Sequence, residues 1–182
     1  MTQFLPSLVS KRLSALARAL TGIAVIIYVF APDRASAQET QARGYWTDPS
    51  TGLMWAGKDN GKDVNWPEAL KYCRDLRLAE YSDWELATID ELEGIYAYNA
   101  HALGRAGKNG KEASTWHVEG NLFLTGHQWS RTQILDDRGR PSGLVWYFDF
   151  ENMYKGKDDG SRFSGRFSNH FRRALCVRRP GQ

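Results

Sequence analysis

The sequence predicts an α+β domain on the basis of three observations. Two amphipathic helices, each with its own capping box, are expected in the first half of the chain. From residue 121 onward, aromatic and β-branched runs broken by turn residues are typical of antiparallel strands. The chain has two cysteines, one on the first predicted helix and one in the last predicted strand. Helices followed by strands in this order are typical of the α+β class.

Residues 1–37 have the layout of a secretory signal peptide. A basic region with Lys11 and Arg12 precedes a 12-residue apolar run, and the small-residue triplet at 35–37 fits a cleavage site. The run is too short for the ~20 residues that span a bilayer core. We therefore expect cleavage before Gln38, export to the periplasm or cell surface, and no membrane span afterwards. The alternative is an uncleaved leader that anchors the protein in the membrane.

The charge balance argues against nucleic acid as a partner. The chain has 24 Lys+Arg and 21 Asp+Glu, but four of the former and one of the latter lie in the leader. The mature chain is therefore formally neutral, and a general nucleic-acid role loses its main support. The charges are unevenly placed, because residues 79–93 hold six acids and no base while residues 160–182 hold six arginines and no acid.

Residues 44–182 fit one domain, preceded by a short mobile lead-in at 38–43. A chain of about 150 residues buries about 68–70% of its unfolded surface, which is enough for a core without metal. The turn cluster at 48–50 predicts a short strand around 53–55.

The first helix is predicted to begin at Asn65, which can cap it together with Glu68 three residues later. A cysteine lies at the centre of its apolar face, so Cys73 is expected to be buried. The second helix is predicted to begin at Thr88, where Glu91 completes the same capping box. The first apolar face consists of Trp66, Ala69, Leu70, Cys73 and Leu76, and the second of Ile89, Leu92, Ile95 and Tyr96.

The rest of the chain is predicted as loops and strands. Residues 99–115 are rich in Gly and Lys and are expected to form a long surface loop. The runs at 128–132 and 143–150 predict a hairpin with a long connecting loop. The Gly- and Asp-rich stretch at 155–161 predicts another turn, and the chain is expected to close with a strand at 173–179.

The two cysteines are expected to form a disulfide, because cysteines of exported proteins usually pair. A Cys73–Cys176 bridge would tie the first helix to the last strand. Closing a loop of about 100 residues stabilises by roughly 4.7 kcal/mol in the chain-entropy model. A reactive Cys73 would need exposure and a positive neighbourhood, and its apolar helix face argues against both.

Five ordered blocks make the chain similar to one bacterial family. The blocks are "DPSTGLMW", "WPEALKYCRDL", "SDWELATIDEL", "QWSRT" and "ALCVRR". They resemble the domain of unknown function named for the C-terminal region of the Legionella collagen-like adhesin. The resemblance implies a C-type-lectin-like fold: two helices packed on small twisted antiparallel sheets, long loops and one disulfide. It also implies a surface or periplasmic setting and, from the named adhesin, binding to sulfated glycans.

The chain departs from the family pattern at three positions. Glu85 stands where the family has arginine, Ala87 where it has proline, and Arg131 where it has the second serine of a W-S-S-T block. The charge reversal at Glu85 is expected to remove or redirect a salt bridge.

The candidate ligand-binding residues lie mainly in the arginine-rich C-terminal region. The planar guanidinium group of arginine pairs well with sulfate, carboxylate and phosphate, so several arginines on a rigid sheet would bind an anionic polymer. The alternative is that they pair with the acidic stretch at 79–93 as structural counter-charges. Most tryptophans are expected in the core, and the one in the polar segment at 114–120 is the exception. The candidates are Arg162, Arg166, His170, Arg172, Arg173 and Trp116, with Arg178 and Arg179 beside them.

Metal and catalytic chemistry have little support. The four histidines lack zinc-ligand spacing, whereas the acid pairs at 136–137 and 158–159 offer oxygen ligands, so calcium stays open as an alternative. No phosphate-binding glycine loop or nucleophile elbow is present. We therefore expect a non-catalytic module that binds an anionic glycan or an envelope or surface protein. The alternatives are a structural or accessory envelope protein and a divergent enzyme on the same fold.

Overall fold

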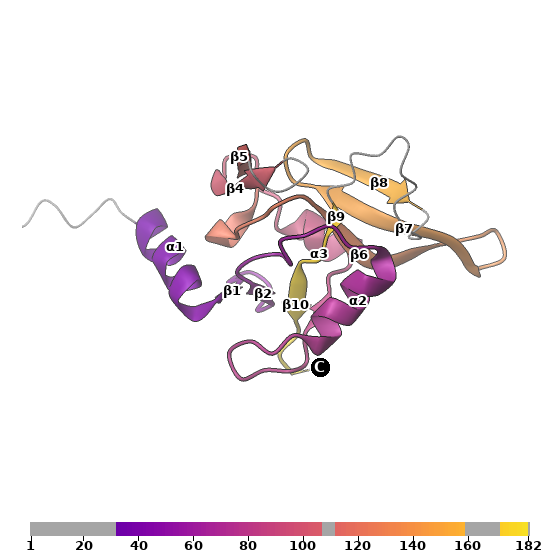
Figure 1. Ribbon diagram of the computed structural model, residues 1–182, viewed down its shortest axis with the longest axis horizontal. Helices are drawn as coiled ribbons and strands as arrows, with labels where there is room; N and C mark the ends of the chain where they lie inside the picture. The colour runs from indigo at the N-terminus through magenta and orange to yellow at the C-terminus, as the bar shows by residue number, and fades with distance from the viewer. Residues whose placement is uncertain (1–31, 107–111, 159–171, 182) are drawn as a thin grey trace, which may run out of the picture. The chain divides into compact units, whose positions relative to one another are not determined.

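The computed structural model describes residues 32–106, 112–158 and 172–181. The chain divides into a unit Met1–Asp33, almost all of it outside the described residues, and a unit Arg34–Gln182 that contains the fold (Figure 1). The expected lead-in at 38–43 belongs to a helix, α1, Pro32–Arg43. Thr40 on this helix is 3% exposed, so the stretch expected as a lead-in packs against other residues of the domain.

A four-stranded antiparallel sheet joins the two ends of the domain. Its order is β1-β2-β10-β3, so the C-terminal strand lies between two strands from the first half of the chain. The register pairs Val177 with Trp55 on one side and with Glu85 on the other. The strands predicted near 53–55 and within 173–179 are thus confirmed. The sheet consists of β1 Tyr45–Thr47, β2 Met54–Ala56, β3 Glu85–Leu86 and β10 Cys176–Arg178.

Both predicted helices are confirmed together with their caps. α2, Trp66–Asp75, begins with a capping box in which the Asn65 side chain accepts from the Glu68 N–H and the Glu68 carboxylate accepts from the Asn65 N–H, each at 2.9 Å. α3, Ile89–Gly94, is capped by Thr88 in the same way. These bonds satisfy backbone N–H groups that the first turn of a helix leaves without partners.

The second half of the chain forms a hairpin and a second sheet. The sheet has the order β8-β7-β6-β9, antiparallel except for the short parallel pair β6–β9. The predicted hairpin is confirmed as β6 and β7. Two expectations are wrong. The region expected to be a surface loop at 99–115 supplies most of the paired strands β4 and β5, and residues 155–158, expected to be part of a turn, belong to strand β8. The strands are β4 Ala102–Ala106, β5 Glu112–Trp116, β6 His127–Leu135, β7 Pro141–Asp149, β8 Tyr154–Asp158 and β9 Arg172–Arg173, with a 3-10 turn at Glu119–Asn121.

One glycine explains why the β4–β5 hairpin can cover the core. A Cβ at Gly104 would lie 2.5 Å from the Trp116 indole and 2.2 Å from the Leu124 carbonyl oxygen, closer than real contacts allow. The missing side chain therefore lets the indole pack across the opposite strand, and Trp116 is only 1% exposed. This corrects the expectation that Trp116 is an exposed ligand contact.

The core consists of two clusters of buried side chains. One contains Trp55, Leu92 and Phe148, and the other contains Trp84 and the bridging cysteines. The predicted Cys73–Cys176 disulfide is confirmed; its Cα atoms are 5.4 Å apart, and both cysteines are fully buried. The bridge joins α2 to β10, so it fastens this helix to the strand that closes the domain.

Candidate functional site

Two of the C-terminal arginines pair with the acidic stretch of the first half. Arg178 donates to Asp83 at 2.6 Å, and Arg179 donates to both oxygens of Glu91 at 2.7 and 2.6 Å. Burial alone would raise the pKa of Glu91, but the hydrogen bonds from Arg179 and Thr88 together with the Arg179 charge outweigh it and hold this pKa below its ordinary value. These two arginines are structural counter-charges, as the alternative interpretation predicts.

Two departures from the family pattern pair with each other. Arg131 and Arg179 each donate to the same oxygen of Glu85 at 2.5 Å. The Glu85 and Arg131 side chains are 51% and 40% exposed, and exposed ion pairs contribute little to stability. Glu85, expected from the sequence to change a salt bridge, thus pairs with Arg131 and Arg179 in this chain.

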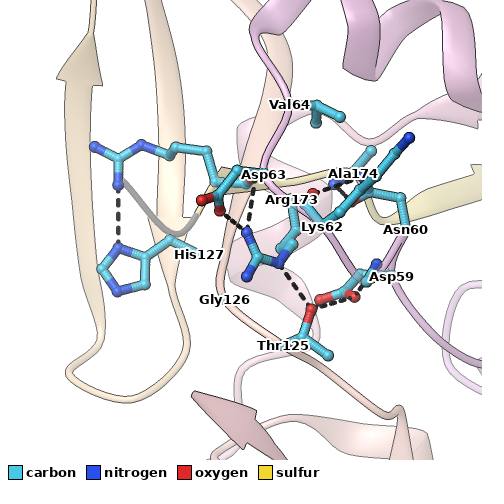
Figure 2. Close-up of polar contacts among 12 residues, drawn as sticks. Asp59, Asn60, Lys62, Asp63, Val64, Thr125, Gly126, His127, Arg173 and Ala174 are labelled. Atoms are coloured by element: carbon cyan, nitrogen blue, oxygen red, sulfur yellow. Dashed lines mark hydrogen bonds and ion pairs between the residues drawn. The ribbon is translucent and has the colours of Figure 1, made fainter. Parts of the chain in front are cut away.

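Arg173 carries a buried charge at the centre of a polar network. Its side chain is 1% exposed, and its guanidinium lies between Asp63 and Thr125 (Figure 2). Nε donates to Thr125 Oγ1 at 2.8 Å, and Nη1 forms an ion pair with Asp63. The Thr125 hydroxyl donates in turn to Asp59 Oδ1 at 2.8 Å. Arg173 thus connects β9 to the loop before α2 and to the segment before β6.

Asp59 is the more deeply buried of the two acids in this network, neither of which the sequence analysis singled out. It is 3% exposed and accepts from the Thr125 N–H at 2.6 Å, the Gly61 N–H at 2.9 Å and the Gln128 amide at 3.0 Å, besides the Thr125 hydroxyl. Burial raises the pKa of Asp59, and these hydrogen bonds oppose the rise. Burial lowers the pKa of Arg173, and the Asp59 charge opposes that fall. The arrangement holds a loop in place and leaves neither charge open to a ligand.

Arg172 is packed against aromatic rings at the other side of β9. Its Cζ lies 3.3 Å from the centroid of the Tyr147 ring, and its Nη2 lies 3.3 Å from Asp158 Oδ2. Its Nη1 lies 3.2 Å from His127 Nδ1. Gly156 makes room for the tyrosine, because a Cβ there would lie 2.2 Å from the ring. Arg172 therefore ties β9 to the far strand β8 across the sheet.

His127 is held in its neutral form by these surroundings. Burial lowers the pKa of His127; the Asp149 charge, with Oδ2 3.7 Å from Nε2, opposes this, and the Arg172 charge lowers the pKa further. The folded pKa therefore lies below the ordinary value of 6.5 that applies to the unfolded chain.

This predicts a pH-dependent loss of stability. As the pH falls below 6.5, the unfolded chain binds a proton that folded His127 resists, so stability present above this value is lost, with a slope of at most about 1.4 kcal/mol per pH unit. The substitution His127→Gln should flatten the slope between about pH 7 and about pH 5.5, measured by urea unfolding. The variant His101→Gln, at an exposed position, should keep the parent's slope. An unchanged slope in His127→Gln would contradict the assignment.

The described candidates do not form one open ligand surface. The structure corrects the interpretation of three of them as open ligand contacts, because their side chains are used inside the fold. These three are Arg172, Arg173 and Trp116, which are 7%, 1% and 1% exposed. The other three, Arg162, Arg166 and His170, lie outside the described residues.

Exposed basic side chains occur instead on β8. The ammonium groups of Lys157 and Lys155 lie 5.0 and 5.7 Å from the centroid of the Trp146 ring. Lys155 also pairs with Glu93 of α3 at 2.7 Å, whereas Lys157 has no carboxylate partner among the described residues. Both lysines are exposed and the ring is half-buried. Sequence reasoning missed this surface because it assigned β8 to a turn.

Metal ligands do not gather in the described part of the chain. No group of three or more His, Cys, Asp or Glu side chains there is suited to hold an ion. Asp136 accepts four hydrogen bonds of 2.8–3.0 Å from Arg138 and Arg140 within its own loop, and Asp158 pairs with Arg172. Calcium binding at these loops therefore stays a prediction without support from their geometry.

The fold and these contacts define a disulfide-linked α+β domain whose described C-terminal arginines have partners inside it. Residues 44–178 match the family model of the Lcl C-terminal domain, so the chain belongs to this family. The match confirms the resemblance carried by the five sequence blocks. No curated protein and no solved structure matches the chain. Among the described helices, none has both the length and the apolar character needed to cross a membrane.

Proposed function

We propose that the protein is an exported, non-catalytic module that binds an anionic glycan at the bacterial envelope or cell surface. Membership of the Lcl C-terminal domain family supports an adhesin-like role. The disulfide supports an oxidising compartment, because such bridges persist outside the cytosol. Both cysteines belong to the bridge, so thiol-dependent catalysis has no thiol to use.

The observation that carries the proposal is the pair of lysines over the Trp146 ring. An acidic sugar can lay its apolar face on an indole while its carboxylate or sulfate meets ammonium groups. Lys157, which has no carboxylate partner in the described part of the chain, can make such a contact, and Lys155 lies near the same ring. β8 ends at Asp158, and the remaining predicted candidates follow it in the sequence, outside the described residues.

The test is binding of the protein to sulfated, uronic and neutral glycans at rising salt. We expect binding to the anionic members only, weakening as salt screens the surface charges. The variant Lys155→Ala/Lys157→Ala should bind between about twofold and about thirtyfold more weakly, because each exposed ion pair contributes about 0.2–1 kcal/mol.

A matched control removes two positive charges elsewhere on the surface. Lys71→Ala/Arg138→Ala changes two exposed cations on α2 and in the β6–β7 loop, and it should bind as the parent does. Equal losses in both variants would mean that net charge, and not the Trp146 surface, controls binding. No binding to any glycan would move the assignment to the second candidate, an accessory protein that recognises a protein partner.

A further inference from the structure

Two adjoining hollows lie along the outer side of α2. The first has a volume of about 390 Å³, and its lining includes the carbon-rich residues Ala56, Leu78 and Phe123. The second has a volume of about 540 Å³ and is lined largely by charged side chains. Tyr72 and Leu76 of α2 line both hollows, so the two adjoin at these residues. We call the combined surface the α2 groove.

The apolar half of the α2 groove is a fixed surface. Phe123 is 40% exposed although its backbone is anchored, since its N–H donates to the Gly57 carbonyl at 2.9 Å and it forms a parallel bridge with Lys58. Tyr72 and Leu76 are half-buried beside it. Burial, followed by the nearby Asp59 charge, raises the pKa of Tyr72, so the phenol stays neutral. A rigid, partly exposed aromatic and aliphatic floor is typical of a binding surface.

The charges around the α2 groove do not cancel. Two of its acids have cationic partners, Asp63 with Arg173 and Asp75 with Lys71. The third acid, Glu68, accepts from the Asn65 backbone N–H and is outnumbered by the cations that follow. Among the described residues, Lys58 and Lys62 have no carboxylate partner, and Arg77 donates only to the carbonyls of residues 74 and 76. The groove therefore presents uncompensated positive charge next to an apolar floor.

We propose that the α2 groove docks an acidic segment of a partner protein, which inserts one large apolar side chain between Tyr72 and Phe123 and sets carboxylates against Lys58, Lys62 and Arg77. This surface is separate from the Trp146 lysines and goes beyond the glycan-binding proposal. The lining favours a peptide over a sugar, because the apolar hollow is built from aliphatic carbon as well as rings. Sugars bind best where a flat ring is surrounded by hydrogen-bonding groups, whereas a leucine or phenylalanine side chain fills a hollow of this kind.

The test uses defined peptides and the ¹⁵N-labelled protein. One set of dodecapeptides carries a central Leu or Phe flanked by Asp and Glu, a second replaces the apolar residue with Ser, and a third replaces the acids with Lys. We expect the first set alone to shift the amide signals of Lys58, Tyr72, Leu76 and Phe123. The variant Lys58→Glu/Lys62→Glu should bind the first set at least about tenfold more weakly, and Phe123→Ala should also weaken it.

A charge-matched variant on the other surface separates this proposal from the glycan one. Lys155→Glu/Lys157→Glu should bind the peptides as the parent does while losing glycan binding. The thermal midpoints of all variants report whether each remains folded. Peptide shifts spread over other surfaces, equal binding of all three sets, or no binding would each overturn the docking proposal. Shifts at the groove produced by a sulfated disaccharide instead would overturn it in favour of a sugar site.

Discussion

Replacing both bridging cysteines with alanine is expected to lower the free energy of unfolding by about 3–5 kcal/mol. The bridge closes a loop with a sequence separation of 103 between Cys73 and Cys176, and it restricts the unfolded chain accordingly. Such a loss is a large part of the 5–15 kcal/mol that typically separates folded from unfolded protein. Urea unfolding of the parent and of Cys73→Ala/Cys176→Ala, each with and without reductant, measures it.

The reductant supplies the control for this prediction. It should lower the unfolding midpoint of the oxidised parent toward that of the double variant and leave the double variant unchanged. Both cysteines are fully buried, so reduction should be slow in the folded state and complete only after unfolding. A double variant within about 1 kcal/mol of the parent would show that core packing alone holds α2 against β10.

The sequence predicts well those features that depend on residues close together in the chain. The two helices are predicted from capping boxes that span four residues each, Asn65 with Glu68 and Thr88 with Glu91, and the structure contains both boxes. The disulfide follows from the expected compartment and from a count of two cysteines. These inferences need no knowledge of which distant segments meet.

The features that were missed depend on contacts between distant segments. The Gly- and Lys-rich composition of residues 99–115 predicts a loop. The β4–β5 pair forms there nevertheless, with Gly104 fitting closely against the Trp116 indole. The sequence of β8 predicts a turn because it contains Gly156, yet a side chain at this position would clash with the Tyr147 ring that packs there. In both cases a residue that signals a loop by composition is instead the small residue that lets an aromatic side chain pack.

The candidate site was missed in part for the same reason. The C-terminal arginines form one group in the sequence, but Arg173 meets Asp63 over 110 residues of chain and Arg178 meets Asp83 over 95. The polar stretch at 58–63 is typical of a loop, and nothing in its local sequence indicates that its two acids meet a buried arginine. The even balance of charge over residues 38–182 did predict internal pairing, which Arg178 and Arg179 confirm.

Arg173→Met is expected to lower the free energy of unfolding by about 3–5 kcal/mol, because it leaves buried acid without its cation. The methionine fills the space of the aliphatic stem but removes the donor to Thr125 and the ion pair with Asp63. Asp59, which is 3% exposed, then loses the nearby positive charge of Arg173. Thermal and urea unfolding give the loss. In the double variant Asp59→Asn/Arg173→Met the buried acid is neutral as well, so part of the loss should return.

Arg131→Met is the matched control, since the same side-chain change at a 40% exposed arginine should cost less than about 1 kcal/mol. Arg173→Lys should fall between parent and Arg173→Met, because it keeps the charge without the planar fork. These outcomes separate a structural arginine from a ligand-binding one. If Arg173→Met unfolded like the parent yet lost glycan binding, Arg173 would belong to the ligand surface and the buried network would need another explanation.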